Sequence, residues 1–395
     1  MTDNREVLLH IENLCQYFGP TKAVDNVSFD IYKKEVFGLV GESGCGKTTT
    51  GRSIIKIYNI VSGNVYFKGQ RICAGTKSYR DAISAARKEK QNCKDAARIE
   101  ELNKIIDENR KEIKKARFDH KHCDREYAKR LVSETRAEFE ERRKHTVSAE
   151  EQAKLEKEYK DAIRIAKKTR LINKIQMIFQ DPIASLDPRM TVREIISEGL
   201  VINGIKDQQY IDEKVYEMLE LVGLVREHAG RYPHEFSGGQ RQRIGIARAI
   251  VMEPELLIAD EPISALDVSI QAQVINLLNE LRERFGLTVL FIAHDLSVVK
   301  YFSDRIGVMY YGNMVELAET EELFAHPMHP YTRSLLSAIP LPDPRSEKKR
   351  VRIIYNPIAE HDYSTDKPTM REILPGHFVR CNDAEEAKYK EELGL

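Results

Sequence analysis

The first pattern along the chain is a series of short apolar runs, each followed by a turn or a polar motif. They are rich in Val, Ile, Leu and Phe and occur at Val36 to Val40, Lys174 to Phe179, Glu255 to Ala259 and Thr288 to Ala293. Helical stretches separate them. Continuous apolar runs of this length are typical of strands that are buried on both faces. The pattern therefore predicts a doubly wound α/β domain with a parallel sheet.

The second pattern is a charged block from Lys77 to Arg170 that contains neither Gly nor Pro. Its apolar positions recur every three or four residues, at Ile99, Leu102, Ile106, Asn109, Ile113 and Ala116. This heptad period predicts a long helix with a narrow apolar seam, from about Tyr79 to Phe118. Ser148 and Glu151 form a capping-box pattern that starts another helix. We expect a helical hairpin that projects from the domain; solvated single helices or partly disordered segments are the alternatives.

Charge separates this block from the rest of the chain. The 395 residues contain 62 basic and 62 acidic side chains, but the block carries 28 basic and 20 acidic ones, a net charge of +8, which leaves −8 elsewhere. A chain of zero net charge has no general attraction for nucleic acid or anionic membranes, so any such binding must be local. The block is a hypothetical docking arm for an acidic partner, anionic lipid headgroups or a sister subunit, or else a solvated spacer.

Length and composition limit the class of protein. The length predicts two or three folding units. The longest apolar runs are far shorter than the about 20 residues that span a bilayer, and charges in Met1 to His10 do not fit a signal peptide, so we expect a cytosolic protein. The six cysteines lack metal-ligand or disulfide spacing, which predicts reduced thiols.

A Gly-rich loop follows the first apolar run and opens a helix. It reads Gly41-Glu42-Ser43-Gly44-Cys45-Gly46-Lys47-Thr48, which is the phosphate-binding pattern GxxxxGK[ST] in its required setting. Its backbone N–H groups converge on phosphates, Lys47 reaches the terminal phosphates, and the Thr48 hydroxyl coordinates Mg²⁺. The loop predicts binding of a nucleoside triphosphate.

Two further motifs add catalytic chemistry. The apolar run Leu256 to Ala259 ends in Asp260 and Glu261: the first can hold Mg²⁺ through water, and the second can orient or deprotonate the attacking water. Ser237-Gly238-Gly239-Gln240 opens another helix and is a second Gly-rich anion cradle. A plain N-cap would not explain its two adjacent glycines.

Together these motifs resemble those of ATP-binding cassette (ABC) ATPases. The resemblance covers residues 5 to 320 apart from the charged block, and it rests on the phosphate loop, Gln180, Ser237 to Gln240, Asp260-Glu261, Ser264 to Asp267 and His294. It implies a RecA-like parallel-sheet core with antiparallel β and α-helical subdomains. It also implies a head-to-tail dimer, in which the signature of one subunit covers the ATP on the phosphate loop of the other.

The resemblance assigns expected roles to single residues. Gln180 senses the γ-phosphate and Mg²⁺, His294 contacts the γ-phosphate, and Asp267 lies at the dimer seam. Thr48, Gln180 and Asp260 are the expected Mg²⁺ site, and Gly41 to Thr49 the expected phosphate site. Phe18 is the first choice and Tyr17 the second for stacking on adenine, although either ring can instead belong to the core.

Two stretches resemble the oligopeptide/dipeptide importer ATPases, of the type called the F subunit. They are Gln180 to Val192 and His326 to Leu336. The expected domains are 1–72 with 171–320 as the cassette, including a helical signature subdomain at about 184–248, then 73–170 as the insertion and 321–395 as a C-terminal extension. Family members often bind an iron–sulfur cluster near a Pro-Gly-His stretch; Tyr355 to Thr369 lacks cysteine, so Cys381 has no partners and we expect no cluster.

The implied function is ATP hydrolysis that energises a prokaryotic peptide importer from the cytoplasmic face of the membrane. The implied partners are a D-type sister ATPase, two transmembrane permease subunits and an extracytoplasmic binding protein, with no nucleic acid. Soluble ABC ATPases of DNA maintenance or translation are the alternatives, as are nickel or glutathione importers. About ninety extra residues before Gln180 are unexplained by the family.

Overall fold

The centre of the molecule is an eight-stranded sheet. The computed structural model describes residues 5–144, 148–339 and 352–395. The strands of this sheet are β3 (Val36–Val40), β6 (Ile175–Ile178), β7 (Leu256–Asp260), β8 (Thr288–Ala293), β9 (Arg305–Tyr310), β10 (Asn313–Glu319), β11 (Thr369–Leu374) and β12 (His377–Cys381). Their order is β11-β12-β10-β9-β3-β8-β7-β6. Strands β6, β7, β8, β3 and β9 are parallel, whereas β10, β12 and β11 add antiparallel pairs.

The four apolar runs form four neighbouring strands of this sheet, β6, β7, β8 and β3, so that prediction is confirmed. Every residue of β3, β7 and β8 is buried. Such strands need an apolar side chain on both faces, because helices cover both sides of a parallel sheet.

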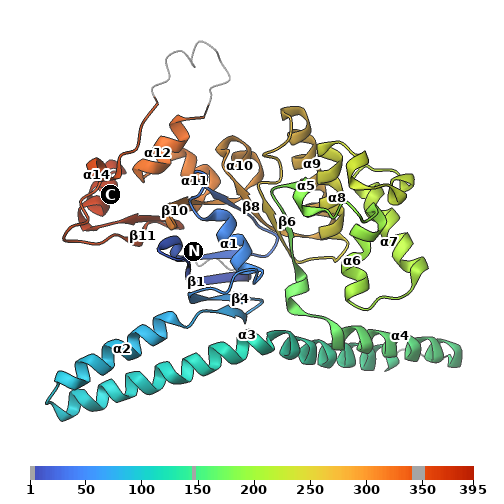
Figure 1. The fold of residues 1–395 in the computed structure, drawn as a ribbon, viewed down its shortest axis with the longest axis horizontal. Helices are drawn as coiled ribbons and strands as arrows, with labels where there is room; N and C mark the ends of the chain where they lie inside the picture. The colour runs from blue at the N-terminus through green and yellow to red at the C-terminus, as the bar shows by residue number, and fades with distance from the viewer. Residues whose placement is uncertain (1–4, 145–147, 340–351) are drawn as a thin grey trace.

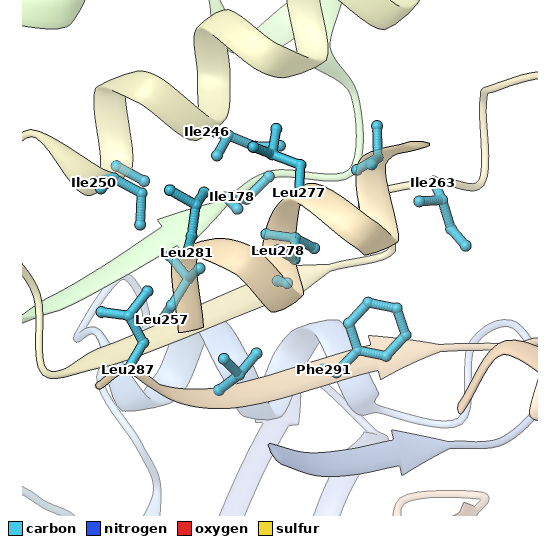
Figure 2. Close-up of a cluster of buried hydrophobic side chains, with 14 of the residues drawn as sticks. Ile178, Ile246, Ile250, Leu257, Ile263, Leu277, Leu278, Leu281, Leu287 and Phe291 are labelled. Carbon is cyan, nitrogen blue, oxygen red and sulfur yellow. The ribbon is translucent and has the colours of Figure 1, made fainter. Parts of the chain in front are cut away.

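Helices α1 (Lys47–Ile54), α8 (Gly238–Ile250), α9 (Val268–Phe285) and α10 (Leu296–Phe302) pack around the parallel strands (Figure 1). Figure 2 shows how α8 and α9 share one core with the sheet: Ile246, Leu278 and Leu281 lie above Leu257 and Phe291. Full burial of such side chains stabilises the fold by roughly 1.5–3 kcal/mol each. This packing fixes the carboxyl end of β7, where Asp260 and Glu261 stand.

A helical region follows β6. It contains α5 (Pro182–Ser185), α6 (Val192–Ile202), α7 (Gln208–Leu221), the 3₁₀ helices η2 (Arg226–Gly230) and η3 (Pro233–Glu235), and α8. Thr191 and Glu194 form a capping box at the start of α6, and the Asp207 side chain caps α7. Arg248 of α8 donates to the carbonyl of Ser185 at 2.6 Å, which ties the region to the loop after Gln180.

A second, antiparallel sheet contains the N-terminal strands in the order β2-β1-β4-β5. Their bounds are β1 (Val7–Phe18), β2 (Thr21–Tyr32), β4 (Ser62–Phe67) and β5 (Gln70–Ala74). Strands β4 and β5 form a hairpin. Lys68 and Gly69 both have positive φ, the geometry of a tight hairpin turn.

The insertion is helical, as predicted, but its helices differ from the prediction. They are α2 (Lys77–Asn92), α3 (Ala96–Lys144) and α4 (Ala149–Lys168), followed by η1 (Leu171–Lys174). The expected single helix from Tyr79 to Phe118 is wrong, because the chain reverses at Cys93 to Asp95. Asp95 accepts a hydrogen bond from the Ala97 N–H and starts α3, a signal that the heptad pattern did not include.

The predicted apolar seam exists, but its partner is α2. Leu102 and Ile106 of α3 form a small core with Ile83 and Ala86 of α2. Helix α3 has 49 residues, which is about 74 Å at 1.5 Å per residue. It passes along the cassette, with α2 packed at one end and α4 at the other (Figure 1).

Two details of the predicted insertion need correction. Helix α4 does begin after Ser148, but within the described residues the Ser148 side chain makes no capping hydrogen bond. The insertion also does not stand wholly outside the cassette core: Tyr127 of α3 belongs to the core cluster of the antiparallel sheet. The Arg71 side chain of β5 is 6% exposed and pairs with Asp119 of α3 at 2.6 Å. The buried Arg71 cation and the apolar surface around it hold α3 against the antiparallel sheet.

The C-terminal part joins the main sheet. Its helices are α11 (Thr320–Ala325), α12 (Pro330–Ser337), α14 (Pro357–Glu360) and α15 (Asp383–Glu392), and β12 pairs with β10. All six cysteines lie in the described ranges, and none forms a disulfide.

Every helix in the described ranges is too short or too polar to span a bilayer.

Candidate functional site: a nucleotide site at the ends of β3, β7 and β8

The phosphate loop connects β3 to α1, and two of its glycines have no substitute. Gly41 and Gly46 have φ values of 147° and 107°. A Cβ on Gly41 would lie 2.2 Å from the Met309 carbonyl oxygen, and one on Gly46 would lie 2.2 Å from that of Ala23. The loop therefore needs glycine both for its backbone conformation and for its close approach to neighbouring strands.

Lys47 is the buried cation of this loop. Its Nζ donates to the carbonyl oxygens of Gly41 and Glu42 at 2.7 and 2.9 Å, which holds the ammonium inside the loop. Burial raises the pKa of the neighbouring Cys45 thiol, so the thiol stays protonated. Cys45 thus fills space in the loop and supplies no charge.

Thr48 and Asp260, both predicted Mg²⁺ ligands, lie together. The Thr48 hydroxyl donates to Asp260 Oδ1 at 2.7 Å. Burial raises the pKa of the Asp260 carboxyl, while Thr48 and Arg52 oppose this shift. Asp260 Oδ2 is buried without a hydrogen-bond partner among the described residues. A buried carboxylate oxygen with a free lone pair fits a hydrated Mg²⁺ beside the phosphate loop.

Glu261, Gln180 and His294 also meet. Gln180 Nε2 donates to Glu261 Oε2 at 2.9 Å, and His294 Nδ1 lies 3.3 Å from the same oxygen. Glu261 has a φ of 45°, a conformation that costs a non-glycine residue energy and that is concentrated at functional sites. The carboxylate is thereby held at the end of β7, where the other two side chains can orient it.

The two candidate adenine-stacking residues differ in availability. The Tyr17 hydroxyl donates to Asp25 at 2.7 Å, and the ammonium groups of Lys22 and Lys77 lie within 5.6 and 5.2 Å of its ring centroid. Phe18 is 45% exposed, and its ring forms a T-shaped contact with that of Tyr58. Phe18 is thus the more exposed candidate, without a polar group tied to a neighbour, and its role in stacking on adenine stays a prediction.

The signature residues are not brought to this phosphate loop. Ser237 caps α8 and forms a capping box with Gln240, and α8 lies far from α1 across the molecule (Figure 1). Ser237, Gly238 and Asp267 are exposed. Within one chain the signature therefore has no phosphate loop to cover, and its free helix start can face another subunit.

One contact of the phosphate loop could not be predicted from the loop motif itself. The backbone N–H of Glu42 donates to the hydroxyl oxygen of Tyr331, in α12, at 3.0 Å. The available signal was the His326 to Leu336 stretch, to which no site role was given. Near Cys381 the described residues contain no cluster of three or more potential metal ligands; the absence of an iron–sulfur cluster stays a prediction.

Comparison with known families matches most of this architecture. Residues 24–156 and 143–264 match the family "ABC transporter", and residues 315–368 match "Oligopeptide/dipeptide transporter, C-terminal region". The chain is 48% identical to the oligopeptide transport ATP-binding protein OppF of Bacillus subtilis, over 96% of this chain and 98% of that one. It is 45% identical to AmiF of Streptococcus pneumoniae, over 98% and 99%.

Among solved structures, the ADP conformation of the ATP-binding cassette MJ1267 superimposes with a TM-score of 0.53 at 21% identity, covering 84% of this chain and 99% of that one. That likeness supports the cassette fold. The chain belongs to the ABC transporter family of ATP-binding proteins.

Proposed function

We propose that this protein is the ATP-hydrolysing subunit of an importer for oligopeptides or dipeptides. The observation that carries the proposal is the near full-length relationship to transport ATP-binding proteins of this type, together with the complete set of ATPase residues at the ends of β3, β7 and β8. The relationship to transport ATP-binding proteins does not favour a role in DNA maintenance or translation.

The geometry supports a separate role in ATP hydrolysis for each of these residues. Glu261 accepts the proton of the attacking water or orients it, while Gln180 and His294 orient the Glu261 carboxylate through its Oε2 atom. Lys47 offers its ammonium to the terminal phosphates. Thr48 and Asp260 would hold Mg²⁺, which neutralises charge on the β- and γ-phosphates when it is bound.

The exposed signature supports a composite ATP site between two subunits. Ser237 to Gln240 would cover the nucleotide of a partner, and Asp267 would lie at the seam. We propose a D-type sister ATPase as that partner. Two permease subunits and an extracytoplasmic binding protein complete the importer, which places this chain peripherally at the cytoplasmic face of a prokaryotic membrane.

Glu261→Gln tests the catalytic assignment. We expect ATP binding to persist while hydrolysis falls by roughly 10² to 10⁴, the usual contribution of a general base. Glu255→Gln is the matched control, since Glu255 lies just before the same strand and pairs with Lys68 instead. Hydrolysis by Glu261→Gln within twofold of the wild type would remove Glu261 from this role.

Ser237→Arg tests the composite site. In complexes mixed with phosphate-loop mutants of either subunit, the defect should fall on the ATP that the partner holds. A defect confined to the ATP of this chain would contradict the head-to-tail arrangement. For the solute, ATPase activity of the reconstituted importer should rise with peptide-loaded binding protein; a response to nickel or glutathione instead would overturn the peptide assignment.

A further inference from the structure

The subfamily stretch at His326 to Leu336 reaches the nucleotide site through one side chain. Tyr331 is 2% exposed, and its hydroxyl oxygen accepts the hydrogen bond from the Glu42 N–H at 3.0 Å. Glu42 is the second residue of the phosphate loop, directly after Gly41. A residue 289 positions away therefore fixes one of the loop's backbone amides.

Hydrogen bonds to the main sheet hold the segment that carries Tyr331. The carboxylate of Glu316, in β10, is fully buried and accepts hydrogen bonds from the N–H groups of Met328 and His329 at 2.8 and 3.1 Å. His329 Nδ1 then accepts from the Tyr331 N–H at 3.1 Å and caps α12. His377 Nε2 of β12 lies 2.8 Å from Glu316 Oε1, the oxygen that also accepts from the Met328 N–H.

We propose that Tyr331 is a positioning residue for ATP binding, through which the C-terminal region holds the phosphate loop in its binding conformation. This inference rests on the proposed ATPase function. His329 holds the Tyr331 backbone, and the buried Tyr331 ring packs against Tyr310 and Tyr355. The hydroxyl oxygen is therefore a fixed acceptor, and the Glu42 amide needs no reorganisation when phosphate arrives. Loss of such preorganisation weakens binding without changing the reacting groups.

Tyr331→Phe removes the acceptor oxygen and keeps the ring. We expect the KM and the dissociation constant for MgATP to rise about 3- to 10-fold, the effect of one lost buried hydrogen bond, while kcat stays within twofold. Tyr355→Phe is the matched control, because Tyr355 contacts the Tyr331 ring but makes no hydrogen bond to the phosphate loop among the described residues. Unchanged MgATP affinity in Tyr331→Phe, or an equal loss in both variants, would overturn the proposal. A wild type that binds no ATP would instead overturn the proposed function.

A second pair of variants separates positioning from folding. His329→Leu removes the cap that holds α12, whereas His329→Asn supplies another acceptor for the Tyr331 N–H. We expect weakened MgATP binding in the first and recovery in the second. Equal affinity in both would contradict the chain of contacts from Glu316 to Tyr331.

Helix α3 also carries a cluster of exposed basic side chains. Between residues 113 and 130 seven exposed side chains are basic: Lys114, Lys115, Arg117, Lys121, Arg125, Lys129 and Arg130. The described structure gives an ion pair to only one of them, Arg130 with Glu134. Glu126 is the one exposed acid of this stretch. We call these seven residues the basic face.

The other two acids of the same stretch contact the cassette instead. Asp119 pairs with Arg71, and Asp124 accepts from the Ile172 N–H. Phe118 lies among the seven basic residues in sequence and is 51% exposed, stacked on His122. The segregation leaves a positive surface about 24 Å long with an aromatic ring in its middle.

The position of the basic face argues against a sister cassette as the molecule that covers it. Helix α1 begins at the phosphate loop, and Lys56, just past its other end, donates to the His120 carbonyl of α3. The basic face thus belongs to the end of α1 opposite the nucleotide. A sister cassette that covers the nucleotide would not cover it.

We infer that the basic face binds the anionic surface of the bilayer in which the importer sits, an inference that also rests on the proposed function. Clustered Lys and Arg side chains are attracted to anionic headgroups, and an aromatic ring among them can enter the interface. Nucleic acid would meet the same charges, but an ABC transporter subunit works beside a membrane, which favours lipid.

Vesicle flotation of the full chain tests this inference, with phosphatidylcholine vesicles that contain or lack phosphatidylglycerol. We expect binding only to the anionic vesicles, weakened roughly 100-fold by Lys114→Glu, Lys121→Glu and Arg125→Glu together, and weakened less by Phe118→Ala. The matched control changes Lys154, Lys157 and Lys160 of α4 to Glu, with the same change in net charge. Equal loss in both triple variants, or binding to duplex RNA but not to vesicles, would overturn the inference; ATPase activity, measured alongside, reports separately on the proposed function.

Discussion

The C-terminal region (residues 320–395) and the insertion (77–170) are both attached to the cassette, but by different kinds of contact. The C-terminal strands continue the main sheet by backbone pairing, and its Tyr331 bonds to the phosphate loop. The insertion meets the cassette mainly along α3, where Asp119 pairs with Arg71 and Tyr127 enters the core; we call these contacts its seat. Its two ends extend beyond that seat (Figure 1).

The difference teaches how an added segment can affect a catalytic core. Backbone pairing and buried polar groups make the C-terminal region part of the structure that shapes the nucleotide site. Exposed ion pairs, such as Arg143–Glu156 at the far end of the insertion, contribute little. A change in the C-terminal region can therefore alter the ATP site. The ends of the insertion, in contrast, are free to vary in length.

The largest expected effect is on the C-terminal attachment. Glu316→Ala leaves His377 and two backbone N–H groups without their buried acceptor, so we expect a loss of about 3–5 kcal/mol in the free energy of unfolding. Urea unfolding measures it, with Glu322→Ala, a more exposed carboxylate near the same histidine, as control. A loss below about 1 kcal/mol would contradict the structural role of Glu316.

The contacts that hold the insertion on the cassette should contribute less to the free energy of unfolding than the Glu316 contacts do. Asp119→Ala deprives the buried Arg71 of its closest carboxylate, but Asn64 still accepts from that guanidinium at 3.2 Å. We expect a loss of about 1–3 kcal/mol, again from urea unfolding. Asp107→Ala, which breaks an exposed pair with Arg110, should cost much less; equal costs would mean that α3 is not seated through Arg71.

Acid should loosen the C-terminal attachment. Burial lowers the pKa of His329 to about 3. Above pH 6.5 both folded and unfolded states carry a neutral imidazole; below it the unfolded chain takes up a proton that the folded state refuses, so stability falls as the pH drops. Between pH 7.5 and 5 this contributes a loss of about 1–2 kcal/mol. His329→Asn should flatten that part of the pH profile, and an unchanged profile would show that His329 is not the titrating group.

The smallest effect is expected for the free end of the insertion. Replacing residues 137–161 by a short Gly/Ser loop removes the tips of α3 and α4, including the Phe139–Tyr159 contact, but keeps Tyr127 in its seat. We expect ATPase activity within twofold and a change of about 0.5 kcal/mol or less in cassette stability. Replacing all of 77–170 should cost more, because Tyr127 then leaves the core. Loss of nucleotide binding in the shortened but folded variant would break the distinction between seat and tip.

The features that could be predicted from the sequence are those that local residue patterns determine. Strands β3, β6, β7 and β8 follow from buried apolar runs, and Thr48, Asp260 and Glu261 follow from motifs tied to strand ends. The parallel sheet then brings these ends together, as the Thr48–Asp260 contact shows. The part of the candidate site that depends on strand order alone was therefore accessible.

The features that could not be predicted from the sequence depend on contacts between residues far apart in the chain, or on local competition between a helix and a turn. The bond from Glu42 to Tyr331 joins residues 289 apart, and the pairing of β12 with β10 has no short-range signal. The reversal at Cys93 occurs without Gly or Pro, where the Asp95 cap competes successfully with continued helix. The left-handed backbone of Glu261 likewise arises from its setting between β7 and β8.

The place of β3 in the sheet has a consequence for biosynthesis. Val36 pairs with Val289 and Phe37 with Arg305, so the central strand of the cassette is made some 250 residues before its neighbours. The antiparallel sheet, in contrast, closes among residues 7–74. At synthesis rates of about 5–20 residues per second, β3 waits about 12–50 s for its partners. Over that interval the nascent chain exposes an apolar strand beside a finished sheet, and it depends on the ribosome-bound environment to keep that strand from pairing elsewhere.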